Sequence, residues 1–285
     1  SIAQAQGDAE IAEQAFAKAS ELNSNRLNDR LGLVAALIEQ GKFDAAGKEL
    51  EQLERLIPDH PGVNYAQARI WLENGNADGA LQELAKVLNV APNHLPSLYL
   101  AASANYTEGN LATAEGQLVR VIDAQPGNIG ALQMLAAVYL QMGEPERTVS
   151  ITRKLLKESP MNAKTLNILA LALATQGMHG ASAEVYQDLA SVSPNSASVQ
   201  MELGTALARS GDISGGIGAL ETAKELDPTS SEIRYRLTRA YIANGDNGAA
   251  EQELTEFRSQ SPVDPLPSVL AAQLALEAGD REQAA

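Results

Sequence analysis

Glycine and proline each recur along this chain at a regular spacing of about 34 residues, and this periodicity constrains the fold more than any other feature. Glycine and proline are the residues that most often end helices and strands, so two interleaved series of them mark a repeated structural unit. The chain is therefore an array of similar units, not one or two globular domains. The glycines are Gly7, Gly41, Gly75, Gly109, Gly143, Gly177, Gly211, Gly245 and Gly279, and the prolines are Pro58, Pro92, Pro126, Pro160, Pro194, Pro228 and Pro262.

The pattern within each unit predicts a pair of helices. With the recurring glycine numbered as position 15, it follows about 14 residues of helical pattern and can adopt the positive φ of a helix C-terminus. The recurring proline is then position 32, where it ends the second helix. The five other prolines fall in first helical turns, where the missing N–H costs little: Pro61, Pro96, Pro145, Pro265 and Pro267.

Positions 8 and 20 of the unit are mostly small, which lets the two helices of a pair cross closely. Alanine accounts for 48 of the 285 residues, whereas aromatic side chains are few, with Tyr 7, Phe 3 and Trp 1. This composition favours helices over the strands of a sandwich or barrel. Position 8 reads Val34, Ala68, Ala102, Ala136, Ala170, Gly204, Thr238 and Ala272, and position 20 reads Ala46, Ala80, Ala114, Thr148, Ser182, Gly216, Ala250 and Ala284.

A helix–turn–helix unit of this length and pattern resembles the tetratricopeptide repeat. The resemblance implies an all-α, right-handed superhelical solenoid, with the first helix of each pair on the concave side. Residues 1–26 are predicted to end a truncated repeat and residues 265–285 to begin another. The seven complete repeats between them are predicted at residues 27–60, 61–94, 95–128, 129–162, 163–196, 197–230 and 231–264.

The two ends of the chain show no polar capping helix of the kind that usually closes a solenoid. We therefore expect the chain to be a segment of a longer array. Uncapped ends would also offer a route to self-association.

Charge and composition exclude several classes of function. The net charge of −15 disfavours binding to nucleic acids and to anionic membranes, because both need a cationic surface. The absence of cysteine excludes disulfides and thiolate metal sites. No apolar run reaches the length of a transmembrane helix, so we expect no membrane insertion by these residues.

The sequence shows no constellation of catalytic or metal-binding residues, so we expect no enzymatic activity, no cofactor and no metal. His60 and His94 fall in predicted loops and His179 in a turn, where we expect exposed side chains. The cluster at residues 215–218, with three glycines, follows a helix turn and not a strand, which argues against a phosphate-binding loop. Two interpretations remain for it, a local hinge or simply a weak second helix.

Partner binding is the more promising activity. In the family that the chain resembles, positions 2, 5, 9, 12 and 13 of the first helix face the concave groove. Tyrosine and arginine there are frequent anchors of protein interfaces and also suit carbohydrate or peptide ligands. The alternative is that the aromatic side chains only fill space between helices. The groove positions yield one candidate patch with Tyr65, Arg69, Tyr99 and Tyr106, and a second with Arg209, Tyr235 and Arg239.

Two aromatic residues are left out of the candidate patches, and one known ligand site of the family is not expected here. Trp71 and Tyr139 lie at position 11, which is more often part of the core. Co-chaperones of the family hold a C-terminal carboxylate with lysine at position 5 and asparagine at position 9 of one repeat. No repeat here has that pair, since Lys164 and Asn167 are isolated, so we do not expect a chaperone-tail clamp.

The amino-acid sequence of residues 207–228 and 240–257 is similar to that of bacterial tetratricopeptide-repeat lipoproteins linked to PEP-CTERM/exosortase exopolysaccharide clusters, the PrsT type. This resemblance implies the bacterial envelope or periplasm, with the cytoplasm as the alternative. It implies a non-catalytic scaffold that binds a partner protein or peptide in the groove, within polysaccharide-export machinery. The alternative function is an arm that positions substrates for a catalytic domain outside these residues.

Overall fold

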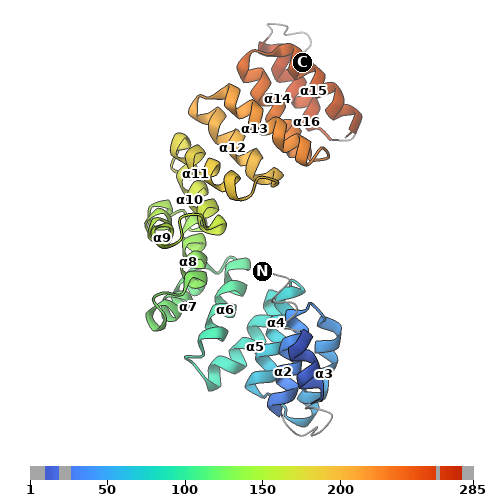
Figure 1. Ribbon diagram of the computed structural model, residues 1–285, viewed down its shortest axis with the longest axis vertical. Coiled ribbons are helices and arrows are strands. Elements are labelled where there is room, and N and C mark those ends of the chain that lie inside the picture. Colours follow the sequence, from blue (N-terminus) through green and yellow to red (C-terminus); the bar gives the residue numbers. More distant parts are fainter. Residues whose placement is uncertain (1–9, 19–26, 261–263, 278–285) are drawn as a thin grey trace. The chain divides into compact units, whose positions relative to one another are not determined.

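The computed structural model describes residues 10–18, 27–260 and 264–277 of the chain. Every regular element in these residues is an α-helix, and no strand occurs among them (Figure 1). The predicted all-α fold class is therefore confirmed. No helix within the described ranges combines the length and the apolar character that crossing a membrane requires.

The helices come in pairs whose bounds recur with the spacing of the turn glycines, to within a residue. Residues 10–18 are also helical. The labelled helices are α2 (Leu27–Glu39), α3 (Phe43–Leu56), α4 (Pro61–Glu73), α5 (Ala77–Val90), α6 (Leu95–Thr107), α7 (Leu111–Ala124), α8 (Ile129–Gln141), α9 (Pro145–Glu158), α10 (Ala163–Thr175), α11 (His179–Val192), α12 (Ala197–Ser210), α13 (Ile213–Leu226), α14 (Ser231–Asn244), α15 (Asn247–Gln260) and α16 (Leu266–Glu277).

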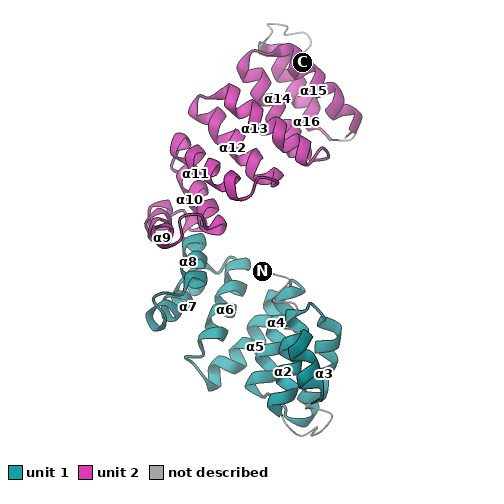
Figure 2. Cartoon of the chain, in the orientation of Figure 1, with its two compact units in different colours: residues 1–138 teal, residues 139–285 magenta. Residues whose placement is uncertain are grey.

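The chain divides into two compact units, which are described separately below (Figure 2). Unit 1 is residues 1–138 and unit 2 is residues 139–285, so α8 contains the boundary. In unit 1, Val34, Leu50 and Val63 belong to an apolar cluster that joins α2, α3 and α4. In unit 2, Tyr186 and Leu203 belong to a comparable cluster of α10 to α13.

The turn glycines behave as the sequence predicts. All seven that the structure describes, from Gly41 to Gly245, have φ between 71° and 102°, the left-handed region that favours glycine. Each second helix from α3 to α13 ends two residues before its recurring proline. Gly7, Gly279 and Pro262 lie outside the described residues, as do parts of both predicted truncated repeats.

The small residues at positions 8 and 20 are buried where the two helices of a pair cross. In unit 1, Ala68 of α4 and Ala80 of α5 are fully buried. In unit 2 the corresponding residues are Gly204 of α12 and Gly216 of α13, and a Cβ on Gly216 would lie 2.8 Å from the carbonyl oxygen of Gly204. The backbones of α12 and α13 thus approach too closely for a methyl group.

This close approach revises the interpretation of the glycine cluster at residues 215–218. Gly216 is part of a tight helix crossing. The interpretation of the cluster as a weak helix did not predict this packing role. Gly215 donates its N–H to Oδ1 of the N-cap residue Asp212 at 2.9 Å. Only Gly218 has open space where a Cβ would be. A hinge at this place stays a prediction.

A buried ion pair occurs at the same two repeat positions in each unit. Arg30 of α2 donates to Glu49 of α3 at 2.8 Å, and Arg234 of α14 is paired with Glu253 of α15. Both arginines are at position 4 and both glutamates at position 23. The side chain of Arg30 is 8% exposed and that of Arg234 is 4% exposed, so each unit fixes one helix pair with a largely desolvated charge contact.

Candidate functional site

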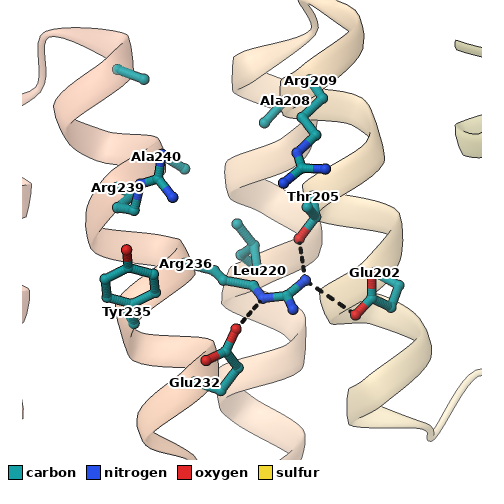
Figure 3. Close-up of a pocket in the computed structure, with 11 residues that line it drawn as sticks. Glu202, Thr205, Ala208, Arg209, Leu220, Glu232, Tyr235, Arg236, Arg239 and Ala240 are labelled. Carbon is teal, nitrogen blue, oxygen red and sulfur yellow. Dashed lines mark hydrogen bonds and ion pairs between the residues drawn. The ribbon is translucent and has the colours of Figure 1, made fainter. Parts of the chain in front are cut away.

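A pocket of about 440 Å³ in unit 2 brings together all three residues of the second predicted patch (Figure 3). It opens between α12 and α14, the first helices of neighbouring pairs, and reaches α13 at its floor. Arg209, Tyr235 and Arg239 all line it. The full lining is Glu202, Thr205, Ala208, Arg209, Leu220, Glu232, Tyr235, Arg236, Arg239, Ala240 and Ala243.

Local structure explains how the two helices present these side chains. Ser196 caps α12 by accepting the N–H of Val199, and Ser230 caps α14 by accepting the N–H of Ile233 at 3.3 Å. Arg209 lies in the last turn of α12, where the helix dipole favours a positive charge. Tyr235 is partly buried and packs against the apolar cluster of α14, α15 and α16.

Arg236 joins the two sides of the pocket and is satisfied there. Its Nε donates to Glu232 at 2.6 Å, and its Nη1 donates to Glu202 at 3.1 Å and to Thr205 at 2.9 Å (Figure 3). Sequence reasoning missed this residue because position 6 is not among the groove positions that the resemblance implied. The available signal was the pairing of opposite charges, since Glu202 and Arg236 occupy the same position of successive repeats.

Arg209 and Arg239 are in a different situation. Both are exposed, and both line the pocket, Arg209 from α12 and Arg239 from α14 (Figure 3). The Arg239 guanidinium lies 5.6 Å from the ring centroid of Tyr235, within the range of a cation–π contact. Within residues 10–18, 27–260 and 264–277, neither arginine has a carboxylate partner. The pocket therefore holds two arginines whose charge is available to a ligand.

The first predicted patch is only partly assembled, at a second pocket of about 250 Å³ in unit 1. Tyr65 of α4 and Tyr99 of α6 line this pocket, whereas Arg69 and Tyr106 do not. The remaining lining residues are Leu95, Pro96, Leu100, Val121, Gln125 and Asn128. No acidic or basic side chain is among the lining residues, so this pocket is uncharged.

Tyr65 also has a packing role. Tyr65 contacts an apolar cluster of α4, α5 and α6, and its ring makes an edge-on contact with His94 at 5.5 Å between centroids. Burial raises the pKa of Tyr65, although the nearby charge of Arg69 acts in the opposite direction. Burial also raises the pKa of Tyr99. Both phenols therefore stay protonated at neutral pH and can donate hydrogen bonds into the pocket.

The predicted exposure of the histidines is wrong. All three are half-buried. His60 caps α4 by accepting the N–H of Gly62 at 3.1 Å, and His94 lies 2.8 Å from the hydroxyl of Ser97. His179 begins α11 and does not lie in a turn. Their side chains serve helix starts and packing, which the loop assignment overlooked.

The interpretation of Tyr139 as a core residue is confirmed, since it is 4% exposed with the guanidinium of Arg147 3.5 Å above its ring. Trp71 is partly buried against the apolar cluster of α4, α5 and α6. Across the described ranges, no group of three histidine, aspartate or glutamate side chains is placed to hold a metal ion.

Sequence profiles of one family match most of the chain. A tetratricopeptide repeat profile matches residues 3–70 and 207–274, and a second profile of the same description matches residues 65–129. The chain belongs to the tetratricopeptide repeat family. No curated protein has a significantly similar sequence.

Solved tetratricopeptide repeat structures share this fold at low sequence identity. The APC/C hetero-tetramer Cut9-Hcn1 matches 92% of this chain with a TM-score of 0.69 and 16% identity, and this chain covers 52% of its length. A tetratricopeptide repeat protein from Parabacteroides merdae matches 82% of this chain and 93% of its own, with a TM-score of 0.61 and 16% identity.

A third similar structure is YrrB, described as a TPR protein with an unusual peptide-binding site. It matches 65% of this chain and 95% of its own, with a TM-score of 0.52 and 14% identity. At these identities the likeness establishes the tetratricopeptide fold alone. The groove side chains of this chain must therefore be interpreted from its own geometry.

Proposed function

We propose that this tetratricopeptide repeat chain is a non-catalytic scaffold that binds a partner protein, or an extended segment of one, along the first helices of its repeats. Proteins of this family generally mediate protein–protein interaction. The observation that carries the proposal is that residues predicted for the groove line two separate pockets, Tyr65 with Tyr99 in unit 1 and Tyr235 with two arginines in unit 2.

Both pockets have the composition of a recognition surface. Each combines tyrosine rings with an apolar floor, and such surfaces supply large contact area at a small cost in side-chain entropy. The structurally similar protein YrrB has a peptide-binding site, and Cut9 is part of a hetero-tetramer. These two proteins show that the same fold can bind other chains.

We propose that the scaffold works in the bacterial cell envelope, where it would serve polysaccharide or protein export. The support is the similarity of the sequence of residues 207–228 and 240–257 to that of lipoproteins of exopolysaccharide clusters. The acidic character of the chain, at −15, suits a soluble surface that faces other proteins. A periplasmic location of the tagged full-length protein in cell fractionation would support this assignment, and a purely cytoplasmic location would contradict it.

The test is capture of partners from envelope extracts with the full-length protein and three variants. Tyr99→Ala and Arg239→Ala alter one pocket each, and Arg258→Ala removes an exposed charge on α15 as a matched control. We expect a cross-linked partner that is retained by the control and lost from at least one pocket variant. If all three variants retain every partner equally, binding does not use these pockets and the proposal fails.

A further inference from the structure

The pocket of unit 2 contains positive charge that the chain does not neutralise itself. Three arginines line this pocket, Arg209, Arg236 and Arg239, against two carboxylates. Two carboxylates, Glu202 and Glu232, line the same pocket, but both are engaged by Arg236. Arg209 and Arg239 therefore face the pocket as free cations, within the part of the chain that the structure describes.

We propose that this pocket binds the carboxylate of an aspartate or glutamate side chain in an extended segment of a partner protein. The inference rests on the proposed scaffold function and names the chemistry of one of its contacts. An arginine guanidinium presents a planar fork of donors that matches the two oxygens of a carboxylate. Arg209 lines the pocket from α12 and Arg239 from α14, so a carboxylate that contacts both side chains would receive donors from both helices (Figure 3).

The surroundings of the two arginines give the site its selectivity. The Arg239 guanidinium lies over the Tyr235 ring, whose π face attracts its positive charge. Arg236 is held by Thr205 and by two glutamates, so it acts as a brace between the helices and its charge is already balanced. Those two glutamates would repel a strongly anionic ligand that sits deep in the pocket, which restricts binding to a single carboxylate near Arg209 and Arg239.

The floor of the pocket indicates a peptide and not a free anion. Ala208, Leu220, Ala240 and Ala243 supply the apolar part of the lining, beside the charged groups. The aliphatic stem of a glutamate and an apolar neighbour in the peptide would bury against these residues, whereas an inorganic anion gains nothing from them. A volume of about 440 Å³ leaves room for several side chains of an extended segment.

The experiment uses an array of short peptides that are acetylated and amidated at their ends, with the central residue fixed and the flanking residues mixed. The full chain is probed against arrays with central glutamate, glutamine and lysine, and the selected peptides are measured by fluorescence anisotropy. The variants are Arg209→Ala with Arg239→Ala combined, and Arg258→Ala as a control on α15. Both pocket arginines are exposed, so we expect the double variant to keep the thermal unfolding profile of the parent.

We expect enrichment of glutamate over glutamine, an affinity that falls at higher salt, and at least about tenfold weaker binding in the double variant but not in the control. Equal binding of glutamate and glutamine peptides, or no loss in the double variant, would overturn the inference. Competition by free phosphate as effective as by the peptide would also overturn it. Peptides that bind without any preference for an acidic residue, and that are lost on Tyr99→Ala, would leave the scaffold function intact while this inference fails.

Discussion

Unit 1 and unit 2 each place a buried arginine at position 4 of a repeat, opposite a glutamate at position 23, and the surroundings of the two pairs differ. Arg30 also donates to Gln52 at 2.9 Å, so its cluster closes within one helix pair. Arg234 lies near Glu256 as well, and Lys224 of the preceding pair reaches both glutamates. The same repeat positions thus stabilise one helix pair in unit 1 and connect two successive pairs in unit 2.

The pockets of the two units also differ, in the charge of their lining residues. In unit 1 the groove side chains Tyr65 and Tyr99 line an uncharged pocket, whereas the pocket of unit 2 has three arginines and two glutamates in its lining. The frame is the same in both units, because small residues at positions 8 and 20 set the helix crossing. The comparison teaches that the repeat fixes the backbone while the chemistry of each groove segment varies independently.

The largest effect is expected from removing the buried arginine of unit 2. Arg234→Ala leaves Glu253, which is 4% exposed, with only Lys224 to balance its charge, and should cost about 3 kcal/mol. Arg30→Ala should cost about 1–2 kcal/mol, because the side chain of Glu49 is 25% exposed and can be hydrated. Urea unfolding, with amide exchange of the two helix pairs, measures both changes. An equal or larger cost for Arg30→Ala would contradict the comparison.

The next effect is at the helix crossings. Gly216→Ala introduces a methyl group 2.8 Å from the carbonyl oxygen of Gly204, so α12 and α13 must separate, at a cost of about 2 kcal/mol. The control in unit 1 is Ala80→Gly, which creates a small gap and loses helix propensity, at a cost of about 1 kcal/mol. Amide exchange of α13 should accelerate in the first variant. A neutral Gly216→Ala would show that this crossing is not tightly packed.

A smaller effect of opposite sign is expected at position 22. Gly218 of α13 and Gly116 of α7 are both helical and have open space where a Cβ would lie. Gly218→Ala and Gly116→Ala should each stabilise the chain by about 0.5–1 kcal/mol, because alanine loses less backbone entropy in a helix. Thermal unfolding measures both. If only Gly116→Ala stabilises, glycine at 218 has a role such as the hinge that the sequence left open.

The smallest effect is a dependence of stability on pH. It comes from the residue at position 26 of the repeat, and we expect it in unit 2 but not in unit 1. The hydrogen bond from Lys224 lowers the pKa of Glu256 below its ordinary value of 4.5, and a contact with Arg234 acts in the same direction. This carboxylate therefore contributes stability above about pH 4.5, which is lost as the pH falls through its lower folded-state pKa. The equivalent residue in unit 1, Gln52, does not titrate in this range.

We expect Glu256→Gln to remove part of the acid loss of amide protection in α14 and α15, without changing α2 and α3. Because the Glu256 side chain is 43% exposed, solvent screens the contact and the change should be small. An unchanged acid profile in this variant would mean that Glu256 does not contribute. Gln52→Glu, at the same repeat position, is the matched substitution in unit 1.

The sequence alone predicted the fold because its determinants are local and periodic. The turn glycines need positive φ, the prolines need helix ends or first turns, and small residues are needed where helices cross. Each requirement recurs once in every repeat, so each repeat confirms the phase of the others. The choice of Arg209, Tyr235 and Arg239 combined this phase with the groove positions that the family resemblance implies, and the structure does bring these three side chains to one pocket.

Tertiary structure decided which groove residues share a pocket and which charges are already satisfied. Arg69 and Tyr106 have suitable positions but lie outside the unit 1 pocket, and Arg236 was overlooked although it crosses the unit 2 pocket. The pairing of Arg234 with Glu253 depends on side-chain reach from one helix of a pair to the other. Periodicity specifies backbone positions, whereas pairing depends on rotamers and distances across helices, and for that reason only the structure separates the braced arginine from the two that remain available.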